Sequence, residues 1–489
     1  MKMIVMGSIC LSIFASILFY AQHLGISVVL FVTATLLALF YFLEQRKKIK
    51  NRKAYFLAIP ILLLASTYFI YNQTFFKVTN MIAILSLTAM MLIWALSEKG
   101  ETKYLVKRIF TCIFAPLEHV SEAMKGITKT LFAKKQREKK VNEHTKQIWT
   151  GIAISLPLLL IVLILLSSAD MIFAQGIQNI ADGLSEGLDK IFENHFLGNL
   201  LARMILILIT TIYMVSFILN LWNKKLFTMP ENEKQAKISM ERTVSNTVVS
   251  ILNIVYAIFC AIQITTLFAK ITPENFNYAE YARQGFFQLM IISAINFAII
   301  LVTTKNEKQG AKGQIFYAKG MNILMTIFTM IILLSAFTRM NLYQQEYGYT
   351  YLRIFVDFAL VTEAFLLIPT LVYIVKPSFH PVKSYLIIVI TMYVVMNFSN
   401  IGNFIAKENV NRYLQSEKRI DFEYLTKTET DGLEEVVRLY QNEPEGSKLK
   451  GNMRRYFAKL EDELQEDTNW QEWNVSKWKA KSLLEKIEK

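Results

Sequence analysis

The chain has 489 residues, of which 53% are hydrophobic and 19% are charged, and its mean hydropathy is +0.34. Soluble domains usually contain about 25% charged residues, whereas apolar runs near the ~20 residues that cross a bilayer recur along this chain. The composition therefore excludes a soluble globular protein and indicates an α-helical integral membrane protein.

The formal net charge of +14 is unevenly distributed. Residues 404–489 hold 16 basic and 18 acidic side chains, a net of −2, so residues 1–403 carry +16. Most of that excess lies in loops between apolar runs, where it orients a membrane protein rather than binding phosphates. We therefore expect no nucleic-acid partner.

Eleven apolar runs are candidate membrane spans. They cover residues 3–21, 24–43, 54–71, 81–97, 150–172, 199–221, 245–269, 286–303, 320–337, 352–374 and 384–400. One set of alternate loops holds about 29 Lys and Arg residues and the other set about six. This asymmetry predicts a cytoplasmic N-terminus and, with an odd number of spans, an extracytoplasmic C-terminal tail.

The loop at residues 98–149 is the largest predicted cytoplasmic segment. Apolar residues recur at helical spacing from Leu105 to Val120, beside Lys103, Lys107 and Arg108. This pattern predicts a basic amphipathic helix that contacts anionic lipid of the inner leaflet, with docking of a cytosolic partner as the alternative.

Two further helical patterns are predicted on the opposite side. Residues 177–192 alternate an apolar face with an acidic face, as expected of a solvated surface helix. In the tail, apolar residues follow helical spacing near 433–440, 453–464 and 476–487. These segments predict a small helical domain, and its Trp470, Trp473 and Trp478 are assigned either to the membrane interface or to a packed core. The tail is also the predicted docking surface for a protein partner.

Three polar clusters lie near the ends of the late spans, at residues 278–289, 338–363 and 397–413. In the second cluster Arg353 and Asp357 are four residues apart, so we expect an intrahelical ion pair that offsets the cost of placing charge in the membrane. Glu363 needs another partner, and Pro369 leaves the carbonyl of Phe365 without its helical donor nearby. An ion or proton site is one interpretation of these groups, and a structural clip with a protonated Glu363 is the other.

Motifs for catalysis are mostly missing. The sequence contains no Gly-rich phosphate loop, His-Glu-x-x-His, Gly-x-Ser-x-Gly or Cys-x-x-Cys motif, and no histidine lies inside a predicted span. Its three cysteines imply no disulfide framework. We expect a protein that is not an enzyme and has neither cofactor nor metal ligands.

Some of these polar segments match a known pattern. Residues 281–289 (YARQGFFQL), 341–353 (NLYQQEYGYTYLR), 406–413 (AKENVNRY) and 420–425 (IDFEYL) resemble a family of bacterial polytopic membrane proteins catalogued only as a domain of unknown function. The resemblance covers roughly residues 240–440. It implies a helical architecture in a bacterial cytoplasmic membrane and assigns no catalytic residue.

The sequence thus predicts an all-α bundle of about eleven spans. The expected segments are four spans in 1–97, the basic loop 98–149, seven spans in 150–403 and the helical tail 404–489. The leading functional hypothesis is handling of a small ion, solute or lipid through a polar cavity near the outer side; the alternative is a non-transporting sensor or scaffold that works through the tail and the basic loop. The predicted cavity residues are Arg339, Tyr343, Glu346, Arg353, Asp357, Glu363 and Asn397.

Overall fold

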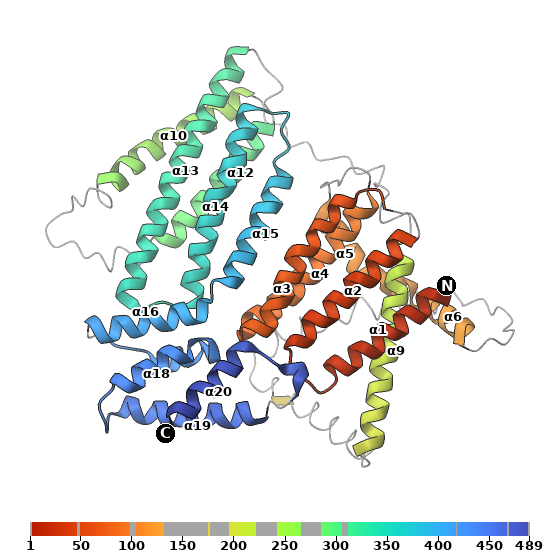
Figure 1. The fold of residues 1–489 in the computed structure, drawn as a ribbon. Helices are drawn as coiled ribbons and strands as arrows, with labels where there is room; N and C mark the ends of the chain where they lie inside the picture. Colours follow the sequence, from red (N-terminus) through yellow and green to blue (C-terminus); the bar gives the residue numbers. More distant parts are fainter. Residues whose placement is uncertain are drawn as a thin grey trace. The chain divides into compact units, whose positions relative to one another are not determined.

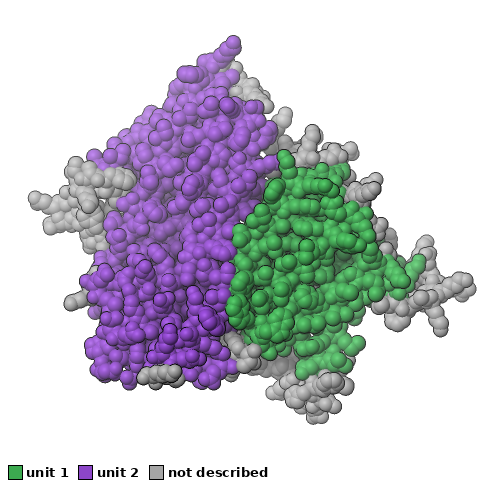
Figure 2. Space-filling view, in the orientation of Figure 1, with its two compact units in different colours: residues 1–69, 78–231, 469–473 green, residues 70–77, 232–468, 474–489 purple. Residues whose placement is uncertain are grey.

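The computed structural model is helical throughout the part of the chain that it describes. That part comprises residues 2–45, 49–97, 104–131, 175–176, 195–221, 242–265, 285–305, 312–416, 418–466 and 469–487. The chain divides into two compact units, shown in different colours in Figure 2. Unit 1 contains residues 1–69, 78–231 and 469–473, and unit 2 contains residues 70–77, 232–468 and 474–489.

Unit 1 is built on apolar helices that are long enough to cross a bilayer. Its membrane helices are α1 (Lys2–Phe19), α2 (Ile26–Gln45), η1 with α3 (Arg52–Leu57 and Ala58–Ile70), α4 (Thr74–Leu96, the first four residues of which belong to unit 2) and α9 (His195–Leu221). A buried cluster joins α1, α2, α9 and the shorter α6 (Val120–Leu131) through Ile4, Phe42, Val215 and Ile127. These helices therefore pack as one body.

The predicted amphipathic helix forms, but it is divided. α5 (Leu105–Phe114) is followed by a 3-10 turn, η2 (Ala115–His119), and then by α6 (Val120–Leu131). Pro116 lies at the start of the turn, where it cannot donate the backbone hydrogen bond that a continuous helix needs. Arg108, predicted to flank the apolar face, is buried.

A short strap from the tail completes unit 1. The strap, residues 469–473, contains η6 (Trp470–Glu472) and lies against the turn between α1 and α2. The backbone N–H of His23 donates to the Glu472 carboxylate (2.8 Å), and that of Ile26 donates to the Trp473 carbonyl (3.2 Å). These bonds satisfy N–H groups at the start of α2 that lack helical acceptors.

The membrane helices of unit 2 lie side by side in Figure 1, and the first four of them in chain order share a buried core centred on Leu333, Met340 and Leu360. They are α10 (Arg242–Gln263), α12 (Phe286–Lys305), α13 (Lys312–Tyr347), α14 (Tyr351–Val375) and α15 (Val382–Phe398). α13 has 36 residues and is therefore about 54 Å long, which exceeds the ~30 Å hydrocarbon core. Its last turns, from Arg339 onward, continue the helix beyond the predicted span 320–337.

The tail begins with a bend. α16 (Ile401–Ser416) turns 56° from α15, and the residue before it, Asn400, has a positive φ of 43°. Four helices follow: α17 (Phe422–Thr426), α18 (Leu433–Asn442), α19 (Lys448–Glu466) and α20 (Val475–Ile487). In Figure 1, α16 crosses the ends of the unit 2 membrane helices, and α18, α19 and α20 lie on its other side. The predicted tail helices are confirmed. Their core also includes Ala406 and Val410 of α16.

The three tail tryptophans settle one of the open alternatives. Trp470, Trp473 and Trp478 are all exposed, so the assignment to a packed helical core is wrong. Leucines, Val436 and Met453 fill that core instead.

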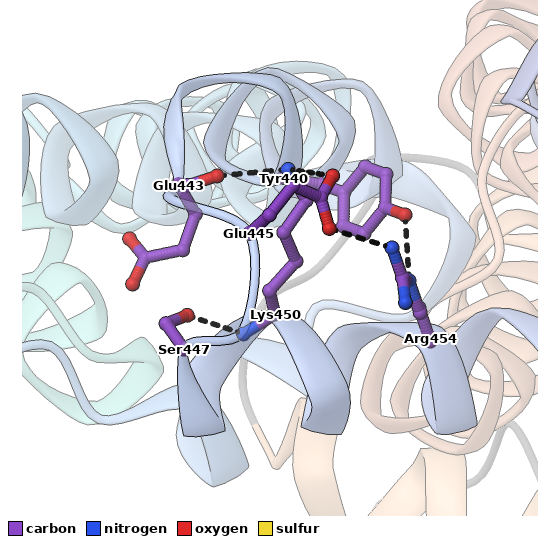
Figure 3. A network of polar contacts seen from close by, with 6 residues as sticks. All are labelled: Tyr440, Glu443, Glu445, Ser447, Lys450 and Arg454. Carbon is purple, nitrogen blue, oxygen red and sulfur yellow. Dashed lines mark hydrogen bonds and ion pairs between the residues drawn. The ribbon is translucent and has the colours of Figure 1, made fainter.

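A polar network closes the turn between α18 and α19 (Figure 3). The Lys450 ammonium pairs with Glu445 at 2.9 Å and also donates to the Glu443 carbonyl at 2.8 Å. Arg454 pairs with Glu445 at 2.8 Å and donates through Nε to the Tyr440 hydroxyl at 3.0 Å. Because Lys450 is buried, these acceptors compensate the loss of its hydration.

The predicted spans agree with the described helices. Among the described residues, nine helices are long and apolar enough to cross a membrane, and the bent pair α15–α16 would make ten. The predicted span at 150–172 and the predicted acidic helix at 177–192 both lie outside the residues that the structure describes.

Candidate functional site

The predicted polar residues are positioned by the turn that joins α13 to α14. α13 ends at Tyr347, Gly348 has a φ of +89°, and the Thr350 side chain caps α14 by accepting from the Arg353 backbone N–H. A left-handed φ favours glycine at the end of a helix. The turn places Arg339, Tyr343 and Glu346 on one helix and Arg353, Asp357 and Glu363 on the next.

Arg353 does not form the predicted ion pair with Asp357. Its guanidinium donates to the Gly348 carbonyl, and its central carbon lies 4.1 Å from the centroid of the Tyr343 ring. The carbonyl end of α13 attracts a cation, and the aromatic face adds a cation–π contact. Spacing on α14 alone omitted both competing partners, which is why the expectation was wrong.

Asp357 is bound instead by Gln344 of α13. The Gln344 amide donates to Asp357 Oδ2 at 2.6 Å, and Gln344 is almost fully buried. The second oxygen, Oδ1, is buried and has no hydrogen-bond partner among the described residues. The result is a carboxyl group inside a membrane helix with unused acceptor capacity.

Arg339 belongs to a separate hydrogen-bonded group. Its Nη2 donates to Gln263 Oε1 at 3.1 Å, and the Ser335 hydroxyl donates to the same oxygen at 2.6 Å. Gln263 is the last residue of α10, so this group connects α10 with α13. Gly285 packs against it, since a Cβ there would lie 2.8 Å from Arg339 Nη1.

Glu363 lies in the middle of α14 and faces Ser293 of α12. The Ser293 Oγ is 2.9 Å from Glu363 Oε2 and 2.8 Å from the Met290 carbonyl oxygen. A serine hydroxyl has one hydrogen, and a carbonyl has none to give. Both contacts are fully hydrogen-bonded when Glu363 is protonated and donates to Ser293 while Ser293 donates to Met290. The other oxygen, Oε1, is buried without a partner in the described part of the chain.

The two remaining predicted residues lie apart from these carboxyl groups. Glu346 is half-exposed and pairs with Lys418 of the tail at 2.6 Å. The Asn397 amide donates to the Tyr393 carbonyl within α15. The bonds of Glu346 and Asn397 therefore belong to other groups than those at Asp357 and Glu363, and the predicted cavity residues fall into several polar groups.

Buried asparagines form hydrogen bonds between the helices of unit 2. Asn296 of α12 accepts from the Tyr256 hydroxyl at 2.7 Å and donates to Thr329 of α13 at 3.1 Å. Asn253 of α10 donates to the Met321 carbonyl at 2.9 Å. Side-chain amides commonly join membrane helices in this way.

A second acidic site, which the sequence reasoning missed, fixes the tail to the start of α4. In η5 (Glu429–Gly432), both oxygens of Asp431 accept from the Asn72 backbone N–H at 3.1 and 3.2 Å, and Glu429 accepts from the N–H and hydroxyl of Thr74. Asp431 is only 8% exposed, and burial raises its pKa to about 6 although hydrogen bonds from Ser476 and Asn72 oppose the shift. Carboxylates are favoured at a helix N-terminus. The sequence signal that could have predicted this site is the pair of acidic residues Glu429 and Asp431 in one turn.

Replacement of Asp431 by asparagine should change how stability depends on pH. Because its pKa is raised to about 6, the folded chain binds more protons than the unfolded chain between about pH 4 and pH 6. The favourable contribution is full below the unfolded pKa of ~3.9 and is lost as the pH rises through about 6. Asp431→Asn should therefore lose less stability than the parent between about pH 4 and pH 7, by on the order of 2 kcal/mol.

Thermal unfolding of the purified protein at several pH values measures this difference. Glu423→Gln is the matched control, because Glu423 is an exposed carboxyl in the same domain and should leave the pH profile unchanged. Parallel profiles for the parent and Asp431→Asn would contradict the assignment.

The many apolar helices and the all-helical fold define a multi-pass integral membrane protein whose polar groups are buried between its helices. The family model described as "Domain of unknown function (DUF4153)" matches residues 58–439, and the chain belongs to that family. The match begins well before residue 240, where the resemblance in the sequence was expected to start. No curated protein and no solved structure matches the chain.

Proposed function

We propose that unit 2 handles a small cation inside the membrane, with the proton as the preferred ion, through Asp357 and Glu363. The carrying observation is that both carboxyl groups are inside one apolar helix and that each has one buried oxygen without a partner among the described residues. A charged Asp costs roughly 2.5–3.5 kcal/mol at a helix centre on insertion scales, so buried acidic groups commonly mark ion pathways.

The contacts around Glu363 favour the proton over a metal cation. A proton on Glu363 would let both short contacts of the Ser293 hydroxyl be full hydrogen bonds, which supports the proton as the ion. Within the described residues no group of three His, Cys, Asp or Glu side chains is placed to hold a metal ion. The proposal assigns no catalytic step to the chain.

The proposed location is a bacterial cytoplasmic membrane with the N-terminus inside and the tail outside. The excess of Lys and Arg in alternate loops supports this orientation. The tail binds the turn at Asn72–Thr74 and the Gly348–Tyr349 turn, which the same alternation places outside. The hydrogen bonds between the tail and these turns thus support the same side for both as the distribution of Lys and Arg does.

Ligand-dependent thermal unfolding tests the proposed site. The purified parent, Asp357→Asn and Glu363→Gln are compared across proton concentrations and a panel of monovalent and divalent cations. A cation at 100 times its dissociation constant should stabilise the parent by about 2.7 kcal/mol, and the two folded variants should lose that gain. Early melting of both variants with no cation effect in the parent would instead assign the carboxyl groups to structure.

A non-transporting sensor is the second candidate role. Asp431 holds the tail to the start of α4 through a carboxyl group whose pKa lies near 6, which makes this contact responsive to external pH. The pH profile of Asp431→Asn tests that role independently of Asp357 and Glu363.

A further inference from the structure

Unit 1 contains an apolar cavity that the proposed ion site does not use. Its volume is about 330 Å³, and it is lined by side chains of α1, α2, α4 and α9 with Ile113 of α5. An apolar cavity of ~150 Å³ already stays dry and binds benzene. The cavity in unit 1 is therefore large enough for a ligand and unsuited to water.

The lining is elongated. On α2 it runs from Phe31 to Phe42, and the eleven residue-to-residue rises between them correspond to about 16 Å along the helix axis. On α1 it runs from Met3 to Leu11. An elongated apolar surface of this kind fits a flexible hydrocarbon chain better than a compact ring.

The cavity is open at its edge. The lining residues Met3, Tyr41 and Leu85 are 40%, 65% and 46% exposed, and they come from three different helices. A Cβ built on Gly7, which also lines the cavity, would meet no atom within 4 Å. A chain can therefore enter from outside the protein without displacing packed side chains.

The surroundings identify what enters. The lining helices cross the membrane, so the adjacent solvent is lipid, and an unfilled space would forfeit dispersion contacts. The lining residues lie mainly toward the N-terminal part of α1 and the C-terminal parts of α2 and α9, and Ile113 of α5 lines the same space. There α5 presents an exposed stripe of Val106, Phe110 and Phe114, as expected of a helix resting in the bilayer interface.

Positive charge lies at the same end. Lys2 directly precedes the lining residue Met3, and Lys107 is exposed on α5. Basic side chains near the membrane surface attract anionic headgroups. We propose that the cavity of unit 1 binds one acyl chain of an anionic phospholipid from the leaflet that α5 contacts. This inference is independent of the ion site in unit 2.

Chain length and cavity filling provide the test. The full-length protein is delipidated in detergent, and its melting temperature is measured with dioleoyl phosphatidylglycerol and with dihexanoyl phosphatidylglycerol. The two lipids share a headgroup, but only the first has chains long enough to fill the cavity. We expect stabilisation by the long-chain lipid alone, together with its retention in native mass spectra.

Variants that fill the cavity should abolish this effect. Gly7→Leu places a side chain in open space and also improves helix propensity, so it should fold. Ala38→Leu fills the same cavity from α2 and guards against failure of the first variant. Gly320→Leu is the control, since Gly320 is an exposed glycine of α13 with equally open surroundings.

Loss of lipid retention and of stabilisation in Gly7→Leu and Ala38→Leu, but not in Gly320→Leu, would support the proposal. Equal stabilisation by the short-chain lipid would overturn it, because binding would then depend on the headgroup alone. Undiminished retention of the long-chain lipid by the filled variants would also overturn it.

Discussion

Glu363→Gln should reduce proton movement across reconstituted vesicles to background while leaving the protein folded. Glutamine has the shape of the protonated side chain and can donate to Ser293, but it cannot release a proton. The melting temperature should therefore change by less than about 4 °C, whereas proton uptake, followed with a pH-sensitive dye inside the vesicles, should disappear. We expect complete loss of proton uptake, because among the described residues no other carboxyl group bonds to Ser293 and could take the place of Glu363.

Glu346→Gln is the matched control for this experiment. Glu346 lies in the same sequence cluster, but it is half-exposed and pairs with Lys418 of the tail. It should retain proton uptake. Proton uptake that persists in Glu363→Gln would refute an ion-handling role for this carboxyl group. The role would also be refuted if Glu363→Gln no longer folds while Ser293→Ala takes up protons normally.

Gly25→Ala should lower the free energy of unfolding by about 3 kcal/mol, near the upper end for an overpacked site. A Cβ at Gly25 would lie 2.6 Å from the backbone carbon and oxygen of Glu472. Because backbone atoms cannot rotate away, the strap at 469–473 must shift and lose its bonds to His23 and Ile26. Thermal unfolding and limited proteolysis at the strap measure the loss.

Gly7→Ala controls for the change of glycine to alanine. A Cβ at Gly7 meets no atom within 4 Å, and alanine favours the helix, so this variant should melt at or above the temperature of the parent. Equal melting temperatures and equal cleavage for Gly25→Ala and Gly7→Ala would show that the close approach at Glu472 carries no energetic weight.

The sequence predicted the membrane helices well because apolar length is a local property. Ten of the predicted spans coincide with described helices when the bent pair α15–α16 is counted as one. Helix ends were less accurate. α13 continues to Tyr347 through the polar residues Arg339 and Gln344, since hydropathy marks the hydrocarbon core and the helix extends beyond it.

The partners of the polar residues were predicted poorly, for a physical reason. Spacing along one helix indicates which residues share a face, and it suggested Arg353 with Asp357. The bonds that form instead join different helices: Gln344 with Asp357, Ser293 with Glu363, and Gln263 with Arg339. Each depends on helix packing between segments 13 to 76 residues apart.

The sequence alone thus determined that this is a multi-pass helical membrane protein, because every residue of a span contributes to its hydropathy whatever the neighbouring helices are. Tertiary structure alone decided which carboxyl groups have unused oxygens, where the tail binds, and that unit 1 contains an apolar cavity. These features depend on distances between helices, and helix packing fixes such distances only after the whole chain has folded.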